Sequence, residues 1–195
     1  MTDVAAVSDR AMGWLFPAEG PALHEAALTV PAGPIVEIGS YCGKSTVFLG
    51  AAARQLGTVV FAVDHHRGSP EMQPGRENHN PALSVDGVHD SLFEFRRTIG
   101  DAGLADHVVA VVGPSMTVAP FWRCPVGMVF IDAAHDFLSV RADFVAWGTW
   151  VLPGGVLAFH DVTIPAINAV ALEAVQAGFV VESEVETLRI LRRPA

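Results

Sequence analysis

The sequence has little positive charge. Its 195 residues include 12 Lys and Arg against 21 Asp and Glu, which gives a formal charge of -9, and Lys44 is its one lysine. A chain this acidic, with no basic run, is a poor partner for a phosphate backbone or an anionic lipid surface. We therefore expect neither nucleic acid nor a membrane as its partner.

Cysteines and long apolar runs are also scarce. Cys42 and Cys124 are too few for a disulfide framework. The longest apolar stretch, 144–159, is broken by glycines and a proline and is too short to span a bilayer. Residues 1–9 lack the basic start and the apolar segment of a secretory signal. These absences predict a cytoplasmic protein, and the chain length predicts a single domain over residues 1–195.

Short apolar runs alternate with helical patterns along the chain. We predict a helical segment over residues 1–30 and a closing strand pair at 179–185 and 187–193. Between them we predict strands at 34–38, 58–63, 107–112, 126–131 and 155–159, and helices at 44–56, 90–100, 140–151 and 165–177. Strands that are apolar on both faces and alternate with helices indicate a parallel sheet covered on both sides.

Residues 65–89 interrupt this alternation. They are polar, contain several Gly and Pro residues, and are predicted to form a long loop. Long loops of this kind often carry function. We expect this one to serve as a lid or as a wall for an acceptor molecule, beside the carboxyl ends of the strands.

The glycine turn after the first predicted strand looks at first like a nucleotide phosphate loop. Such a loop has four residues between its first glycine and its Gly-Lys pair, whereas Gly39 and Gly43 have three between them. The third glycine of the dinucleotide fingerprint is also absent. A kinase or GTPase therefore stays as a rival hypothesis that the spacing disfavours. A catalytically silent binding module is a second alternative.

The acidic residues around this turn suit a different ligand. Glu37 precedes the turn and would suit a cationic group. Asp64 ends the next strand, 21 residues after Gly43, where a carboxylate accepts hydrogen bonds from ribose hydroxyls. Gly113 and Ser115, after the third strand, are placed to border an adenine.

Taken in order, these strand ends resemble the class I S-adenosylmethionine-dependent methyltransferases. Glu37-x-Gly39-x-x-x-Gly43 looks like their first motif, and Asp64 looks like their ribose-binding acid. Residues 13–15, 36–46, 130–132 and 152–155 look like the small bacterial O-methyltransferases of the macrolide-sugar and polysaccharide-capping type. The resemblance implies a Rossmann-like α/β fold, with a seven-stranded, mostly parallel sheet, helices on both faces and an antiparallel last strand. It also implies a cofactor site made by Glu37, Gly39, Gly43, Ser45, Asp64, His65, Gly113, Ser115 and Asp132.

A second group of polar residues follows the fourth and fifth strands. Asp132 and Asp161 would lie at the ends of neighbouring strands about 4.8 Å apart, where two carboxylates suit a hard cation such as Mg²⁺. The alternative is that each only caps the following helix. Metal-dependent O-methyltransferases of the catechol type carry an Asp-Asn pair where this chain has His160-Asp161. An imidazole ligand at His160 would favour Mn²⁺ or Co²⁺ over Mg²⁺.

His135 lies three residues after Asp132, at the position where that family has a basic catalytic residue. A neutral histidine there could take the proton of an acceptor hydroxyl. The loop histidines His65, His66, His79 and His89 could help to hold a hydroxyl-rich acceptor, or belong to a solvated loop. The same two alternatives apply to the polar residues among them, Arg67, Glu71, Arg76, Glu77 and Asn78. The sequence thus predicts a divalent-metal-assisted O-methyltransferase acting on a sugar, an oligosaccharide or another polyhydroxylated small molecule, with a homodimer left open.

Overall fold

The computed structural model describes residues 3–195 and is built on one seven-stranded sheet. The strand order is β5-β2-β1-β6-β7-β9-β8. Strands β1, β2, β5, β6 and β7 are parallel, and β9 is antiparallel to both of its neighbours. This confirms the predicted class I methyltransferase fold. The strands are β1 (Ile35–Ile38), β2 (Val60–Asp64), β5 (Val108–Val112), β6 (Val126–Ile131), β7 (Val151–Phe159), β8 (Val180–Val185) and β9 (Leu188–Arg192).

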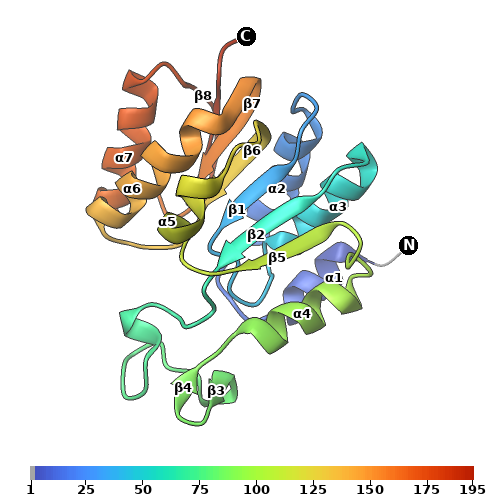
Figure 1. Cartoon of the computed structure of the whole chain (residues 1–195), viewed down its shortest axis with the longest axis vertical. Coiled ribbons are helices and arrows are strands. Elements are labelled where there is room, and N and C mark those ends of the chain that lie inside the picture. The colour runs from blue at the N-terminus through green and yellow to red at the C-terminus, as the bar shows by residue number, and fades with distance from the viewer. Residues whose placement is uncertain (1–2) are drawn as a thin grey trace.

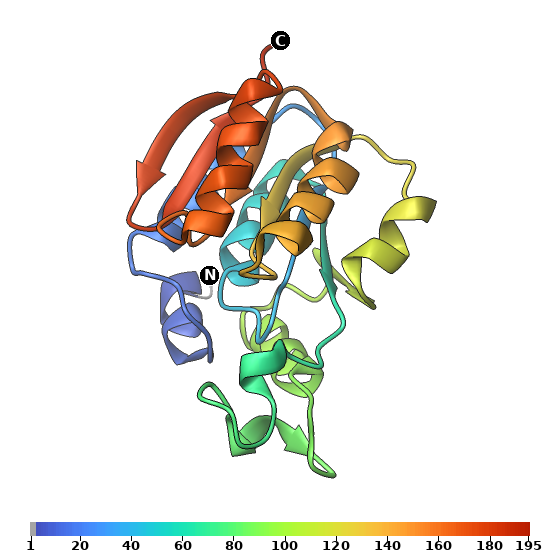
Figure 2. The ribbon, with the colours of Figure 1, turned by 90° about the vertical axis from the view of Figure 1, so that its left-hand side faces the viewer.

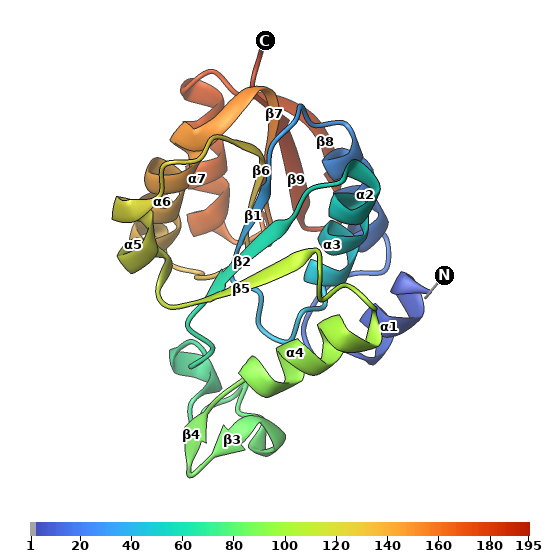
Figure 3. The ribbon, with the colours of Figure 1, turned by 45° about the vertical axis from the view of Figure 1, so that its right-hand side comes forward.

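Helices cover both faces of this sheet (Figure 1). One face carries α1 (Val4–Arg10), α2 (Glu19–Leu28), α3 (Thr46–Leu56) and α4 (Leu92–Asp101), and the other carries α5 (Ser115–Val118), α6 (Phe137–Trp147) and α7 (Pro165–Gln176). Figure 3 shows the two layers on either side of the sheet, and Figure 2 looks onto the layer that contains α6 and α7. A hydrophobic cluster lies between the sheet and each layer, so every residue of β1 and β6 is buried. Among residues 3–195, no helix is both long and apolar enough to cross a bilayer.

Two of the predicted helical segments differ from the helices in the structure. The predicted helical segment over residues 1–30 is two helices, α1 and α2, joined by an irregular stretch at 11–18. Helix α6 begins at Phe137 rather than near Val140, because the Asp136 side chain accepts a hydrogen bond from the Ser139 N–H and caps the first turn. Both differences affect residues that line the site described below.

The segment 65–89 is more structured than predicted. It contains short 3₁₀ turns at Pro70–Met72 and Pro81–Leu83, and a small hairpin of β3 (Ser84–Val85) and β4 (Val88–His89). Asp86 and Gly87 form its turn with φ of 51° and 77°, as a two-residue type I′ turn requires. The segment lies below the carboxyl ends of the parallel strands (Figure 1). Its role as a lid, or as a wall for an acceptor molecule, stays a prediction.

Candidate active site

Two cavities meet at the carboxyl edge of the sheet. From the adjacent strands β1 and β6 the chain continues to β2 on one side and to β7 on the other, and open α/β sheets bind their ligands at such a switch point. The histidine cavity, about 350 Å³, is lined by Asp132, His135, His160 and Asp161 and by the 12–16 segment. The strand-end cavity, about 630 Å³, is lined by residues that follow β2, β5 and β6. The two cavities share Gly39, Tyr41, Met72, Asp132 and Ala133.

Asp64 holds the glycine turn in place. Its Oδ2 accepts hydrogen bonds from the N–H groups of Ser40 at 2.9 Å and Tyr41 at 2.8 Å, and its Oδ1 accepts one from the N–H of His66 at 2.7 Å. Asp64 also lines the strand-end cavity. The residue that the sequence predicts as a ribose ligand therefore shapes the turn as well as facing the cavity.

Asp64→Asn is expected to weaken S-adenosylhomocysteine binding about 10- to 100-fold, because an amide cannot accept from three N–H groups and would leave some of them unpaired. The free energy of unfolding is expected to fall by about 1–3 kcal/mol for the same reason. Calorimetric titration and denaturant unfolding measure the two effects. The matched control is Asp86→Asn, since Asn suits the Asp86-Gly87 turn. An affinity within twofold of wild type would contradict the role of Asp64.

Glu37 lies beneath the turn rather than in either cavity. It is fully buried, and its two oxygens accept hydrogen bonds from the hydroxyls of Ser45 and Thr46 at 2.6 and 2.5 Å. Burial raises its pKa to about 8, although the two hydroxyls lower it. In this structure Glu37 thus bonds to the start of α3 and lines neither cavity, and its contact with a cofactor stays a prediction.

The glycines of the turn serve close packing. A Cβ on Gly39 would lie 2.2 Å from the carbonyl oxygen of Asp132, and φ at Gly39 is +85°. Gly43 packs against α4 with φ of +86°. Only a glycine at position 39 lets the turn approach the end of β6, which brings Asp132 to the wall shared by the two cavities.

The ammonium group of Lys44 is largely engaged within the protein. Its Nζ donates hydrogen bonds to the carbonyl oxygens of Ser8 at 3.0 Å and Ala11 at 3.3 Å, at the C-terminal end of α1. A cation is favourable at this end of a helix. The one lysine thus ties α1 to the glycine turn, which weakens the support for a kinase or GTPase.

Asp132, His160 and Asp161 form a compact cluster in the histidine cavity. His160 Nδ1 lies 3.1 Å from Asp132 Oδ1 and 3.4 Å from Asp161 Oδ2, and one ligand atom from each of the three residues lies within 4.8 Å of the others. Burial would lower the pKa of His160, but the carboxylates around it outweigh this effect and raise the pKa to about 12. The cluster therefore favours a positive charge, either a proton or a cation.

Glu19 fixes the other side of His160 and is a residue that sequence reasoning missed. Its Oε2 accepts a hydrogen bond from His160 Nε2 at 2.9 Å, and its Oε1 accepts from the N–H and hydroxyl of Thr187. Glu19 is fully buried, yet its pKa is lowered because the hydrogen bonds from His160 and Thr187 outweigh burial. The only local signal was an acidic residue in the first turn of a helix, which usually interacts with the helix dipole.

His135 lies at the mouth of the cluster and is partly exposed. Its Nε2 is 3.3 Å from Asp161 Oδ2, and its Nδ1 is 3.6 Å from Glu71 Oε1. The hydrogen bond to Asp161 raises the pKa of His135, with burial acting against it. With Nε2–H donating to Asp161, Nδ1 is the nitrogen that can accept a proton.

The match to known families agrees with this geometry. Residues 36–162 match a family model described as a methyltransferase domain. The chain belongs to this methyltransferase family. The matched region runs from β1 past β7, so it contains both strand-end groups of the site.

Solved structures of O-methyltransferases share the fold of this methyltransferase. The O-methyltransferase NovP is 15% identical with a TM-score of 0.71, over 90% of this chain and 79% of that one. TomG from Streptomyces achromogenes, in complex with SAM, is 18% identical with a TM-score of 0.68, over 100% and 87%. An O-methyltransferase from Bacillus cereus, in complex with SAH, is 19% identical with a TM-score of 0.66, over 97% and 87%.

Of the remaining residues predicted to form the site, some line one of the two cavities and others do not. His65 and Ser115 line the strand-end cavity, whereas Gly113 precedes α5 and lines neither cavity. Of the loop residues expected to hold an acceptor, Glu71 and Asn78 line the histidine cavity. In contrast, His66 and His89 are buried and line neither cavity. The acceptor role predicted for these two histidines is therefore not supported.

Proposed function

We propose that this methyltransferase uses S-adenosylmethionine and a divalent cation to methylate a hydroxyl group of a sugar or another polyhydroxylated small molecule. The observation that carries the proposal is the cluster of Asp132, His160 and Asp161 in the histidine cavity, directly beside the strand-end cavity. A cofactor in one cavity and an acceptor in the other would meet at the shared wall of Gly39, Tyr41 and Asp132.

The strand-end cavity and the adjoining turn suit S-adenosylmethionine. The cavity follows the three strands that bind this cofactor in the class I fold that the chain resembles, and it carries Asp64 and Ser115. Ser40 Oγ, on the turn, is buried and has no hydrogen-bond partner among residues 3–195, and Ser40 lines the histidine cavity. A ligand group can satisfy this orphaned hydroxyl. When bound, the cofactor supplies a methyl group on a sulfonium.

The donor set of the cluster suits a divalent cation. Adjacent ligand atoms of an octahedral Mg²⁺ lie roughly 3 Å apart, given metal–oxygen distances of about 2.1 Å. The distances of 3.1 and 3.4 Å from His160 Nδ1 to the two carboxylates are close to this value. Because Nε2–H donates to Glu19, Nδ1 of a neutral His160 keeps its lone pair for the cation. One imidazole with two carboxylates accommodates Mn²⁺ or Co²⁺ as well as Mg²⁺. A cation held there would lower the pKa of an acceptor hydroxyl.

The chain's own residues can then position the acceptor and take its proton. Asp161 orients His135 through Nε2, and Nδ1 receives the hydroxyl proton. The carboxylate of Glu71, 3.6 Å from Nδ1, stabilises the imidazolium that results. Holding the acceptor oxygen and the methyl group in line accounts for much of the rate of such a transfer.

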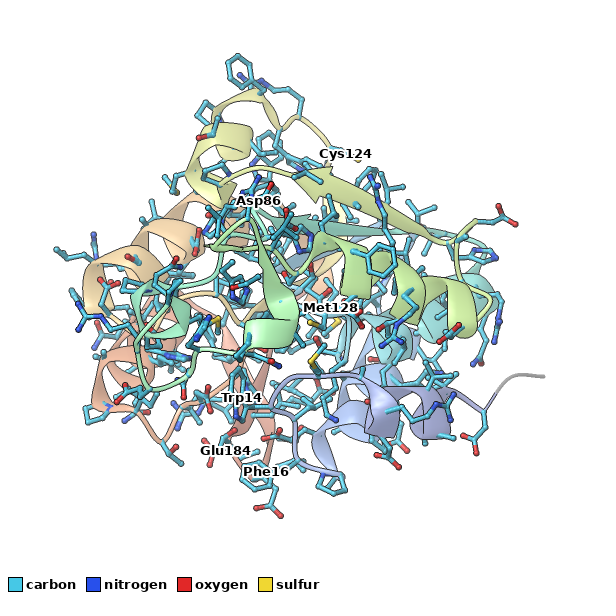
Figure 4. The ribbon with its side chains drawn as sticks, turned by 90° about the horizontal axis from the view of Figure 1, so that it is seen from below. Trp14, Phe16, Asp86, Cys124, Met128 and Glu184 are labelled. Carbon is cyan, nitrogen blue, oxygen red and sulfur yellow. The ribbon has the colours of Figure 1, made fainter. Side chains whose placement is uncertain are left out.

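The lining of the histidine cavity supports an acceptor with both polar and apolar sides. Glu71 and Asn78 can hydrogen-bond hydroxyl groups. Trp14 and Phe16, 60% and 51% exposed, offer ring faces at the same cavity. Figure 4 shows both on the segment between α1 and α2, seen from below. A sugar ring, with hydroxyls around its edge and C–H groups on its faces, matches this lining.

Calorimetric titration with S-adenosylhomocysteine, followed by an acceptor screen with and without chelator, tests the proposal. We expect micromolar or tighter binding of S-adenosylhomocysteine, and methyl transfer to a hydroxylated acceptor only when a divalent cation is present. Absence of binding would overturn the cofactor assignment. Equal turnover with and without chelator would overturn the cation assignment alone.

Glu19→Gln is expected to weaken Mn²⁺ binding about 10- to 100-fold, the usual effect of losing a carboxylate that orients a metal-ligating histidine. The amide cannot accept from both Thr187 and His160 as the carboxylate does, so the ring loses its fixed orientation. Electron paramagnetic resonance of free Mn²⁺ gives the affinity without recourse to activity. The matched control is Glu25→Gln on the exposed side of α2. Equal Mn²⁺ affinity in both variants would show that Glu19 only supports the fold.

A further inference from the structure

A buried carboxylate in the strand-end cavity has no part in the chemistry above. Asp143, on α6, is 4% exposed, and its Oδ1 accepts a hydrogen bond from Ser115 Oγ at 2.5 Å. Its Oδ2 accepts no hydrogen bond from residues 3–195 and is not fully enclosed by them, so it is open to the strand-end cavity that Asp143 lines. A largely buried carboxylate needs a donor for each free oxygen, and at Oδ2 either water or a ligand can supply it. The cavity can therefore take a hydrogen-bond donor of a ligand at this oxygen.

The surroundings of Asp143 indicate what kind of donor this is. Side chains of Met116, Ala134, Leu138 and Ala142 make an apolar lining in the same cavity, which suits a flat ring. Asp64 and His65 line the cavity at the end of β2, Ser115 at the start of α5, and Asp143 from α6. The cavity thus combines a polar part at β2 with an apolar part that includes one acceptor.

We propose that Asp143 is a specificity-determining residue that accepts a hydrogen bond from the 6-amino group of the cofactor's adenine. The proposal rests on S-adenosylmethionine being the cofactor. Ser115 Oγ is a positioning group, because its hydrogen bond to Oδ1 leaves Oδ2 to the ring. Burial raises the pKa of Asp143 to about 6, against the hydrogen bond from Ser115, so the carboxylate is largely ionised at neutral pH and acts as an acceptor only.

A 6-oxo analogue provides a direct test. In S-inosylhomocysteine an oxygen acceptor replaces the amino group, and this oxygen would face the Asp143 carboxylate. We expect the wild-type protein to bind S-inosylhomocysteine about 10- to 100-fold more weakly than S-adenosylhomocysteine, as for a buried group left without its partner. In Asp143→Asn the amide N–H can donate to the 6-oxo group, so the two affinities should come within about threefold of each other. Calorimetric titration of both ligands gives the ratio.

Two further variants separate recognition from general damage. Asp106→Asn, on the surface and outside both cavities, should keep the wild-type ratio. Ser115→Ala keeps the Asp143 carboxylate but removes the hydrogen bond that orients it. This variant should discriminate less between the two ligands, while its thermal unfolding stays close to wild type. If Asp143→Asn is folded and still discriminates as wild type does, the assignment of Asp143 is wrong and the proposed function stands. If the wild-type protein binds neither ligand, the proposed function falls first.

Discussion

Removal of divalent cations is expected to abolish turnover while leaving S-adenosylhomocysteine binding nearly intact. The candidate ligands Asp132, His160 and Asp161 gather in the histidine cavity, whereas the contacts expected for adenosine lie on β2, α5 and α6. Dialysis against chelator, followed by calorimetry and an activity assay, separates the two functions. Turnover should return on addition of Mg²⁺, Mn²⁺ or Co²⁺.

Asp132→Asn is the matching variant, and it should lose cation binding because a site with three protein ligands cannot spare a carboxylate. Its control is Asp136→Asn, four residues further on, since Asn caps the start of α6 as well as Asp does. Full activity in excess chelator would refute the cation. His160 would then serve as a fixed positive charge among its carboxylates.

The sheet could be predicted from the sequence because its signal is local. Each parallel strand is a short run that is apolar on both faces, and runs such as 126–131 match the observed strand residue for residue. The placement of Asp132 and Asp161 follows from the same rule, since the carboxyl ends of neighbouring parallel strands meet at one edge. Asp64 faces the predicted cavity for this reason too.

The partners of these side chains could not be predicted, because they depend on distant segments. Glu19 accepts a hydrogen bond from His160, which lies 141 residues further along the chain, and no pattern in the neighbouring sequence predicts this contact. The sequence places Glu37 near a ligand, whereas in the structure its two carboxylate oxygens accept hydrogen bonds from the hydroxyls of Ser45 and Thr46. Periodicity tells which residues are buried, whereas hydrogen-bond partners are set by how the helices pack on the sheet.

His135→Ala is expected to lower turnover about 10²- to 10⁴-fold, the usual contribution of a general base. Cation binding should be unaffected, because His135 lies outside the cluster of Asp132, His160 and Asp161. The pKa of His135 is raised above 6.5 by its hydrogen bond to Asp161, and the base acts when unprotonated. Turnover of the wild-type protein should therefore rise with pH along a limb that lies above pH 6.5, and this limb should vanish in the variant.

His24→Ala is the control, since His24 bonds to Gln55 on α3 and lines neither cavity. Added imidazole should restore part of the activity of His135→Ala by occupying the vacated space, and should do nothing for His24→Ala. A pH profile is decisive because loss of packing alone would lower turnover at every pH without removing the limb. If His135→Ala keeps near wild-type turnover with the cation bound, the proton goes to another group, and Glu71 at 3.6 Å from His135 Nδ1 is the nearest candidate at the histidine cavity.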